Sequence, residues 1–551
     1  MTLLEYEDRE QLRGRASPGS TGRVAEPVRP LGLWPRRVWL AGLGAAAAWA
    51  LLGALLADRE ILNPGGWTIV GDFLSAALHP ELATDFLVTV RSAAAVTVAY
   101  ATVGTALALV IGLLGGLLSS EVLWLTDPLA EPRRRPPLGR WVVRAAAAST
   151  RGVHEAVWAL LLVSVLGRDP WVAVLAIGVP FGAVTAKVVA ELLDDVPRAP
   201  VAALRAAGAG RLPSVIYGLG PTVLPDVIAY ACYRFECALR SSVVLGVIGA
   251  GGIGFELLQS FQSLRYEEIW TLIYALCALA LIADRGSVAL RRRARRHRAG
   301  LRLGLVVIAV AVAVRQLDLR PGSLLAARAR RLLGDLASRS LPPRLPPGGS
   351  AQLWGAVVDT VQMSLIAITI AVVLATPLAF VAARAGDGRQ GTRVPGRAVR
   401  AGLLLLRTVP PVLWAFLVLL VVFPGPLPGG IALGLYSAGV LGRLKAEAVE
   451  NADPAPRRAL RTAGAGSVAA FAYGTVPVVA PRFASLALYR WEVVVRETVV
   501  VGLVGAGGLG RLLAQQNAAL DEPRMLTTIA TLIAVALAVD TVSGHVRAAL
   551  R

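Results

Sequence analysis

The stretch GVIGAGGIG at residues 246–254 returns as GLVGAGGLG at residues 502–510, at an offset of 256 positions (502 − 246 = 256). The first copy places glycines at Gly249, Gly251 and Gly254, with the spacing Gly-x-Gly-x-x-Gly. This spacing is typical of dinucleotide-binding sites, where glycines let a strand–helix turn approach a pyrophosphate. Such a site needs alternating strands and helices around it, so the flanking sequence decides whether a cofactor binds here.

The same offset recurs along most of the chain. ALRAAGAG at 203–210 returns as ALRTAGAG at 459–466, and YRFECALR at 233–240 returns as YRWEVVVR at 489–496. It also links Arg144 to Arg400, Trp158 to Trp414 and Glu191 to Glu447. A repeat that keeps one register from residue 144 onward indicates an internal duplication.

Composition places the repeats in a membrane. The chain has 551 residues, of which 55% are hydrophobic, and a mean hydropathy of +0.62. The apolar residues form blocks of about 20, long enough to cross a bilayer as helices. We therefore expect an all-α polytopic membrane protein with about twelve transmembrane helices. The expected spans are 37–57, 86–118, 152–167, 170–190, 221–248, 268–284, 301–315, 354–383, 401–423, 428–443, 477–504 and 525–541.

Charge predicts the orientation of the spans. The net charge is +20, and Lys187 and Lys445 are the only lysines, so arginine carries nearly all of the positive charge. Arginine-rich loops mark the cytoplasmic side, which is a better explanation here than nucleic-acid binding. Basic loops after an even number of crossings place both termini in the cytoplasm and make the halves two parallel six-helix repeats.

The expected organisation has four parts. A disordered cytoplasmic tail at 1–35 precedes a first copy at 36–290, whose core is 85–284. A basic cytoplasmic linker at 291–300 leads to the second copy at 301–551, whose core is 350–541. The loop 316–351 is rich in arginine although it should lie outside, which questions whether 301–315 crosses. We expect it to cross, because the repeat requires it.

Metal and cofactor chemistry is not expected in this chain. The three cysteines lie in apolar segments, and the four histidines have no ligand spacing. We expect neither a metal site nor a bound cofactor.

Two cytoplasmic segments, 187–225 and 443–481, distinguish two classes of transporter: an ion-coupled secondary transporter and the membrane subunit of an ATP-driven importer. Each segment predicts two short helices separated by a glycine turn, followed by a proline before the next span. Gly208 and Gly464 would supply the turns. A rigid, protruding helical pair of this kind is what a separate ATPase could grip.

These segments resemble the coupling loop of type I ABC importer permeases (MetI-like), whose pattern is Glu-Ala-Ala, three residues, Gly, nine residues, Ile-x-Leu-Pro. Gly208 with Pro221, and Gly464 with Pro477, keep that spacing. The wider run is similar to phosphonate importer permeases over about 85–284 and 350–541. The resemblance implies a permease for phosphonate, phosphite or a phosphate ester in a bacterial cell membrane. It also implies two partners, an ABC ATPase subunit in two copies and an extracytoplasmic phosphonate-binding protein.

The loops depart from the pattern in both copies. Its Glu is Ala202 and Arg458 here, and its Ile is Gly218 and Gly474. Glu191 and Glu447 are candidate substitutes for the missing acid, and a simple capping or solvating role for them is an equal alternative.

No ATPase motif is expected in the chain itself. A phosphate-binding loop needs Lys followed by Ser or Thr. Lys187 precedes a valine and Lys445 an alanine. The chain is therefore predicted to be a permease without catalytic residues, with ATP hydrolysis in a separate subunit.

The fifth span of each copy carries charges that membranes rarely tolerate without a function. The acid and the second arginine stand four residues apart and can pair, or the arginine can bind an oxyanion along the pathway. For Arg234 and Arg490, on another face and nearer the cytoplasmic end, a neutralising role that holds the fold is the preferred interpretation. The candidate pathway residues are Tyr233, Glu236, Arg240, Tyr489, Glu492 and Arg496.

The repeated glycines of 246–254 and 502–510 end a span in each copy, with no alternating strands and helices around them. We expect them to let backbones pack closely near a gate. A membrane-bound dehydrogenase is a further interpretation, and only the Gly-x-Gly-x-x-Gly spacing supports it. The candidate gate and packing glycines are Gly249, Gly251, Gly252, Gly254, Gly505, Gly507, Gly508 and Gly510.

Overall fold

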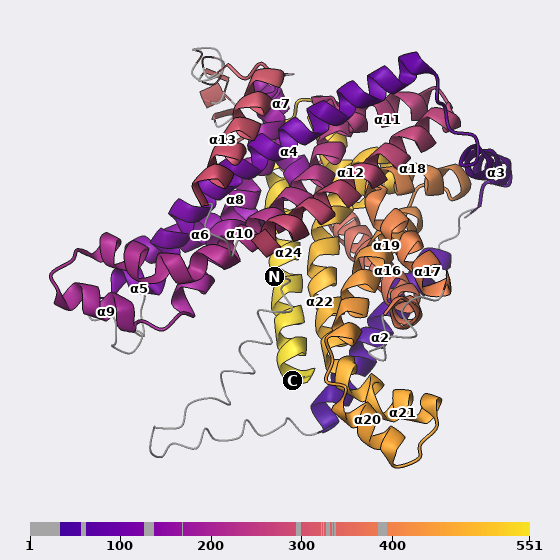
Figure 1. Ribbon diagram of the computed structural model, residues 1–551. Coiled ribbons are helices and arrows are strands. Elements are labelled where there is room, and N and C mark those ends of the chain that lie inside the picture. The colour runs from indigo at the N-terminus through magenta and orange to yellow at the C-terminus, as the bar shows by residue number, and fades with distance from the viewer. Residues whose placement is uncertain are drawn as a thin grey trace. The chain divides into compact units, whose positions relative to one another are not determined.

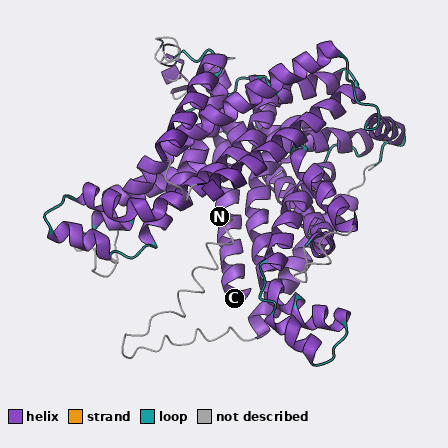
Figure 2. Ribbon diagram, in the orientation of Figure 1, coloured by secondary structure: helices purple, strands orange, loops and turns teal. Residues whose placement is uncertain are grey.

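The computed structural model describes residues 33–56, 62–125, 137–167, 169–293, 299–320, 338–383 and 394–550, with a few positions between 322 and 335. Residues 1–32 of the expected tail and 294–298 of the expected linker lie outside this set. The described chain is helical, with no strand beyond one isolated bridge between Leu62 and Val422 (Figure 2). The expectation of an all-α fold is confirmed.

The helices fall into two compact units. Residues 71–343 form one unit, and residues 1–70 with 344–551 form the other, so the division lies inside α3 (Gly66–Ala76). The first unit holds α4 (Thr84–Ser119), α5 (Glu121–Trp124), α6 (Leu138–Gly152), α7 (Glu155–Leu166), α8 (Trp171–Asp194), α9 (Ala199–Ala206), α10 (Arg211–Leu245), η1 (Gly246–Ala250), α11 (Ile253–Gln262), α12 (Tyr266–Arg293) and α13 (Ala299–Gln316). The other holds α2 (Leu33–Leu55), α16 (Gly349–Ala382), α17 (Val394–Thr408), α18 (Pro411–Val421), α19 (Pro426–Glu450), α20 (Ala455–Thr462), α21 (Ser467–Gly474), α22 (Val476–Val501), η2 (Gly502–Ala506), α23 (Gly508–Ala518) and α24 (Glu522–Leu550).

The units differ from the expected copies at their first helices. Helix α2 packs on α16, where Ala50 is fully buried against Ile366 and Leu488. Helix α13 packs on α4, where Ala313 joins Tyr100 in one core cluster. The first helix of each predicted copy is thus buried by helices of the other copy, and the boundaries 36–290 and 301–551 do not mark the compact units.

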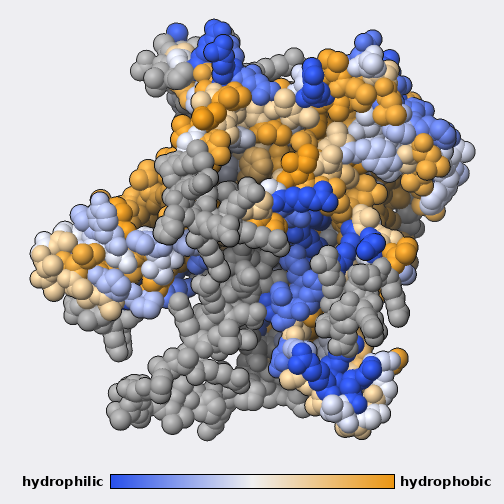
Figure 3. All heavy atoms as spheres, viewed as in Figure 1, coloured by the Kyte–Doolittle hydropathy of each residue, from blue (hydrophilic) through white to orange (hydrophobic). Residues whose placement is uncertain are grey.

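Six described helices are long and apolar enough to cross a membrane, and two bent helix pairs raise the number to eight. Apolar residues cover much of the described surface in the view of Figure 3. Val110 and Leu114 on α4 are among the exposed apolar side chains of these helices. The six are Thr84–Ser119, Trp171–Asp194, Arg211–Ala250, Tyr266–Ala289, Gly349–Ala382 and Glu522–Ala549. The expected number, about twelve, exceeds the six to eight that meet this criterion.

The remaining expected spans are helical but do not meet this criterion of length and hydropathy. Those at 37–57, 152–167 and 301–315 fall on α2, α7 and α13, in which the shorter apolar stretches Ala41–Leu55, Glu155–Leu166 and Gly304–Gln316 are found among the described residues. The one at 428–443 is α19, whose first turns are rich in glycine and proline.

Small residues set the main helix contacts within each unit. Helix α4 runs alongside α8, and α16 alongside α19 (Figure 1). A Cβ on Gly104 of α4 would lie 2.8 Å from the Ile177 side chain, and one on Gly430 of α19 would lie 2.7 Å from that of Ile366. These side chains occupy the space that the glycines leave, which is the usual way membrane helices approach closely.

Candidate functional site

The two candidate coupling loops are helical pairs joined at glycine. In the first, α9 ends at a turn where Gly208 has φ +87°, and in the second, α20 ends where Gly464 has φ +88°. At each turn a backbone N–H reaches five residues back, Ala209 to Leu204 and Ala465 to Leu460. This left-handed C-terminal cap favours glycine. The glycines therefore lie where the sequence predicted the turns, and their role in coupling stays a prediction.

The prolines that follow act differently in the two loops. Pro477 lies in the first turn of α22, after a 47° bend that separates α21 from the span. Pro221 lies inside α10, which runs without a break from the loop into the span. The expected second short helix thus exists in the second copy and is absent as a separate element from the first. Leu219, which is fully buried in the first copy, is replaced in the second by Thr475 at the bend.

Glycine also allows the two helices of each loop to cross closely. A Cβ on Gly474 would lie 2.8 Å from Cα of Arg457, and one on Gly218 would lie 3.2 Å from the backbone N of Val201. These are the positions at which the coupling-loop pattern has isoleucine. The departure noted in the sequence therefore has a structural cause, because a side chain there would force the helices apart.

We expect Gly474→Ile to destabilise the second loop although it restores the residue of the pattern. The added side chain must displace the backbone of α20, at a cost of about 1–3 kcal/mol. Limited proteolysis of the detergent-solubilised protein should show faster cleavage within 455–474. Gly220→Leu is the matched control, since it also restores the pattern but meets nothing within 4 Å. Equal cleavage rates in the two variants would contradict the proposed crossing.

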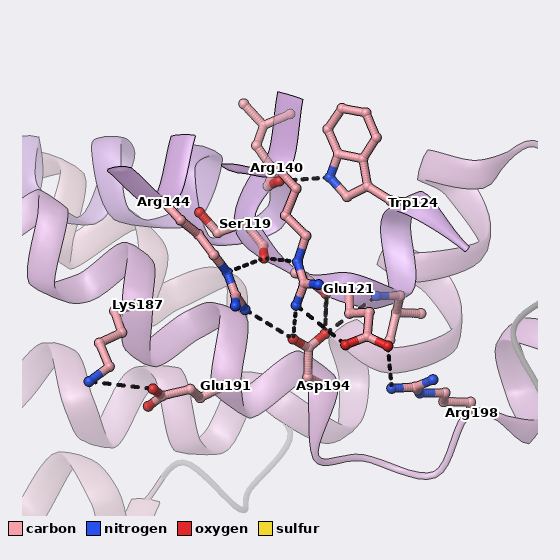
Figure 4. Close-up of polar contacts among 12 residues, drawn as sticks. Ser119, Glu121, Trp124, Arg140, Arg144, Lys187, Glu191, Asp194 and Arg198 are labelled. Atoms are coloured by element: carbon pink, nitrogen blue, oxygen red, sulfur yellow. Dashed lines mark hydrogen bonds and ion pairs between the residues drawn. The ribbon is translucent and has the colours of Figure 1, made fainter. Parts of the chain in front are cut away.

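Asp194 organises the base of the first loop (Figure 4). Its Oδ1 accepts hydrogen bonds from Ser120 Oγ at 2.7 Å and from the backbone N of Glu121 at 2.7 Å. Its Oδ2 lies 3.7 Å from the guanidinium groups of both Arg140 and Arg144. The carboxylate therefore caps α5 and ties the end of α8 to α6.

Glu121 extends this cluster toward the coupling helix. Its carboxylate lies 3.3 Å from Arg140 Nη2 and 3.8 Å from Arg198 Nη2, and Arg198 immediately precedes α9 (Figure 4). Arg205 of α9 in turn donates to the backbone oxygen of Leu125 at 3.2 Å. Both ends of α9 are thus fastened to the α4–α5 segment.

The second copy repeats part of this clamp. Arg400 Nη2 lies 2.5 Å from Glu450 Oε1, and Arg400 Nε donates to the backbone oxygen of Ala382 at 2.7 Å. Arg144 and Asp194 stand 256 residues before Arg400 and Glu450. The repeat was recognised from the sequence for Arg144 and Arg400. It was not recognised for Asp194 and Glu450, although these acids stand at the same offset.

The first copy has seven more residues in this region. Arg144 Nε donates to the backbone oxygen of Ser119 at 3.2 Å, as Arg400 does to Ala382. These acceptors are 263 residues apart (382 − 119 = 263) rather than 256. In the first copy the stretch between Ser119 and Arg144 includes α5 and Glu121.

Glu191 and Glu447 pair within their own helices. Glu191 lies 3.7 Å from Lys187, and Glu447 accepts from Arg443 at 2.8 Å, both four residues earlier (Figure 4). Such exposed pairs stabilise a helix by only a few tenths of a kcal/mol. The geometry favours the helix-solvating alternative, and a coupling role for these acids stays a prediction.

We expect Asp194→Asn to loosen the first loop. The amide keeps one acceptor but loses the charge that both arginines face, at a cost of about 1–3 kcal/mol. Thermal unfolding should show a lower midpoint, with a larger loss of substrate-dependent ATP hydrolysis by the assembled transporter. Glu191→Gln is the control and should change stability by no more than about 0.5 kcal/mol. Equal shifts in the two variants would refute the special role of Asp194.

The candidate pathway residues lie on α10 and α22 but do not pair as expected in the second copy. Glu492 is buried, and its carboxylate lies 2.5 Å from Arg547 Nη1 of α24. Arg496 Nε donates instead to the backbone oxygen of Glu492 at 3.2 Å. Arg240 makes the corresponding contact with the backbone oxygen of Glu236 at 3.4 Å. Sequence reasoning missed Arg547, because it lies two helices further along the chain.

Tyr233 and Tyr489 are the most exposed of the pathway candidates, at 38% and 41%. The earlier arginine of the second copy, Arg490, is buried and lies 2.6 Å from Glu497. Arg490 therefore has a neutralising partner within its own helix, and this partner was not identified from the sequence.

The repeated glycines form a reversal between two helices. Gly249, Gly251 and Gly252 have φ of +110°, +89° and +74°, and Gly505, Gly507 and Gly508 repeat this pattern. A Cβ on Gly254 would lie only 1.9 Å from the backbone oxygen of Val243, and one on Gly510 would lie 2.5 Å from that of Val499. Close backbone packing is thus observed as expected, and gating stays a prediction.

A threonine from the first long helix of each unit holds this reversal. Thr97 Oγ1 accepts from the backbone N of Ile253 at 2.9 Å, and Thr360 Oγ1 accepts from that of Leu509 at 2.9 Å. Within the described chain the glycines join helix to helix through a kink at Gly249 and at Gly505, so the strand that a dinucleotide site needs is missing there.

Comparison with known proteins agrees with these features. The family described as "Binding-protein-dependent transport system inner membrane component" matches residues 129–296 and 375–551. The chain belongs to this family. It is a multi-pass membrane permease, a transport subunit that is not itself catalytic, and it contains the family domain twice.

Several curated relatives are similar to the chain. The phosphate-import permease protein PhnE of Mycolicibacterium smegmatis is 29% identical over 425 residues, covering 75% of this chain and 79% of the relative. The phosphite transport system permease protein PtxC of Stutzerimonas stutzeri is 36% identical over 215 residues, covering 39% and 76%. The putative cryptic phosphonate transport system permease protein PhnE2 of Escherichia coli is 33% identical over 118 residues, covering 21% and 97%. No solved structure matches the chain.

Proposed function

We propose that this chain is the fused, two-copy permease of an ATP-driven importer for a phosphorus oxyanion: phosphonate, phosphite or phosphate. The observation that carries the proposal is the pair of helical coupling loops, one in each family domain. The names of the relatives support the substrate class, since they describe phosphate, phosphite and phosphonate transport. Import proceeds toward the cytoplasm, where both termini lie, across a bacterial cell membrane.

A separate ABC ATPase, in two copies, hydrolyses the ATP. Neither lysine of the chain can bind nucleotide phosphates, because neither precedes Ser or Thr. Lys445 is moreover buried and donates to Thr376 Oγ1 at 2.7 Å. ATP binding draws the two ATPase copies together, the loops transmit the movement, and an extracytoplasmic binding protein delivers the anion.

Each loop offers an aromatic contact for this ATPase. Tyr217 is 75% exposed and Tyr473 is 78% exposed, and they stand at the same register of the two copies. The loops differ in charge, because α20 carries Arg457, Arg458 and Arg461, none of them buried. Exposed tyrosines beside charged residues are common anchors of protein interfaces.

We expect Tyr217→Ala and Tyr473→Ala each to weaken ATPase binding by about tenfold or more. Surface plasmon resonance with the purified ATPase on the immobilised permease measures the loss. Phe255→Ala is the control, since Phe255 is an exposed aromatic residue on α11, beyond the other end of α10. Unchanged affinity in both tyrosine variants would contradict docking at these loops.

Reconstitution tests the function as a whole. Proteoliposomes containing the permease, the ATPase and the binding protein should hydrolyse ATP faster when methylphosphonate, phosphite or phosphate is added outside. The ion-coupled alternative predicts uptake that needs no ATPase and collapses with the membrane potential. Stimulation by none of the three anions would refute the substrate class.

A further inference from the structure

Arg234 lies within the candidate span Arg211–Ala250 and is enclosed by aromatic rings. Its Cζ lies 4.8 Å from the centroid of Phe181, 5.2 Å from that of Tyr230 and 5.9 Å from that of Tyr233. Its Nε donates to the hydroxyl of Tyr230 at 2.8 Å. Stacking on aromatic faces and one hydrogen bond therefore fix the plane of the guanidinium.

The rest of this guanidinium is not satisfied by the protein. Among the described residues no carboxylate lies within ion-pair distance of Arg234, and its two Nη groups have no hydrogen-bond acceptor. As a residue Arg234 is half-buried, and the neighbouring Tyr233 is 38% exposed. A cation within a membrane protein with unsatisfied donors is costly unless an anion or water completes it.

The second copy supplies an internal comparison. Arg490 stands 256 residues later and also lies by an aromatic ring, 5.2 Å from the centroid of Tyr436. There the guanidinium is completed by the protein, since it lies 2.6 Å from Glu497 and donates from both Nε and Nη2 to Ser437 Oγ at 3.1 Å. Arg490 is buried. The arginine at this register is thus neutralised by the protein in the second copy, where it is Arg490.

The sequence shows why the first copy lacks this neutralisation. The positions that match Ser437 and Glu497 are Phe181 and Ser241. Ser241 Oγ bonds Glu155 at 2.6 Å rather than facing an arginine. At these two positions the first copy therefore has neither the hydroxyl acceptor nor the acid, and the Nη groups of Arg234 keep donors that no described residue accepts.

We propose that Arg234 binds the transported oxyanion and that its counterpart Arg490 does not. The two Nη groups can donate in parallel to two oxygens of a phosphonate, phosphite or phosphate group, which is the geometry that arginine favours. This assignment rests on the proposed function for its substrate class. It makes the two fused copies unequal, with the first holding the anion and the second using the same arginine as a structural ion pair.

The test adds a carboxylate to the first copy. Phe181→Glu places an acid beside Arg234, at the position of the Ser437 acceptor, and Phe181→Gln is the neutral variant of the same size. Binding of inorganic phosphite to the purified full chain is measured by isothermal titration calorimetry, and thermal unfolding verifies that both variants fold. We expect Phe181→Glu to raise the dissociation constant about tenfold or more over Phe181→Gln, and Arg234→Gln to raise it similarly over the unaltered chain.

The outcomes separate this inference from the proposed function. Equal affinities of the Glu and Gln variants, or unaltered phosphite binding by Arg234→Gln, would overturn the role of Arg234 while leaving the importer intact. Sulfate binding with the same dependence on Arg234, without binding of phosphite, phosphonate or phosphate, would overturn the substrate class and keep the anion site. An unaltered chain that binds none of these anions would overturn both.

Discussion

Gly254→Ala is expected to prevent the chain from reaching its folded state in the membrane. The new Cβ would lie 1.9 Å from the backbone oxygen of Val243 and 3.0 Å from Cα of Gly246, so no side-chain rearrangement can make room for it. Either α11 must move away from the end of α10, or the kinked segment η1 must change its backbone conformation. Overpacking of this kind costs about 3 kcal/mol or more, a large part of the stability of a membrane-protein domain.

The measurements are the amount of protein in the membrane and the thermal unfolding midpoint of the detergent-solubilised chain. Gly220→Ala is the control, because Gly220 lies in α10, the helix against whose end Gly254 packs, and a Cβ there meets nothing within 4 Å. Gly510→Ala should reproduce the defect in the second copy, where the Cβ would lie 2.5 Å from the oxygen of Val499. Normal abundance and stability of Gly254→Ala would show that the tight reversal does not form.

This reversal illustrates what the sequence could predict. The repeated glycines indicated close backbone packing, since glycine recurs where a Cβ has no room, and the structure has that packing in both copies. Thr97 and Thr360, which hold the reversal, were not predictable in the same way. They are 263 residues apart, outside the 256-residue register that starts at 144, and a threonine in an apolar helix gives no signal of its own.

The helical segments were predictable from apolar blocks, but their partners were not. Block length predicted the helix at 37–57 and also the one at 301–315, which the structure has as α2 and α13. Nothing in either pattern indicates that α2 packs on α16 and α13 on α4, because an apolar face does not specify which helix buries it. Packing across the chain order is therefore visible only in the structure.

Ion pairs were the least predictable part of the candidate site. The spacing of four suggested that Glu492 pairs with Arg496, whereas Glu492 pairs with Arg547 from a distant helix. A spacing of four places two residues on one helix face, but it does not exclude a better-placed partner on a neighbouring helix. Asp194 was also missed, since its partners come from the α4–α5 junction, from α5 and from α6.

Glu497→Gln is expected to produce the second large effect, in the second copy. Arg490 and Glu497 have side chains only 8% and 13% exposed, and they lie 2.6 Å apart. Removing the charge of one partner leaves the other buried without compensation, at a cost of about 3–5 kcal/mol. Arg490→Gln should cost a similar amount. Thermal unfolding in detergent without substrate measures both losses.

The double variant Arg490→Gln with Glu497→Gln separates a lost ion pair from lost packing. If the loss of stability arises from a buried charge without its partner, the double variant should be more stable than either single variant, because neither charge remains. Additive losses would contradict the ion pair as the cause. Arg234→Gln is the comparison in the first copy, and we expect it to lower stability far less, because no carboxylate is left behind when its charge is removed. A residue repeated at the same register would then stabilise one copy of the permease and leave the other available for the anion.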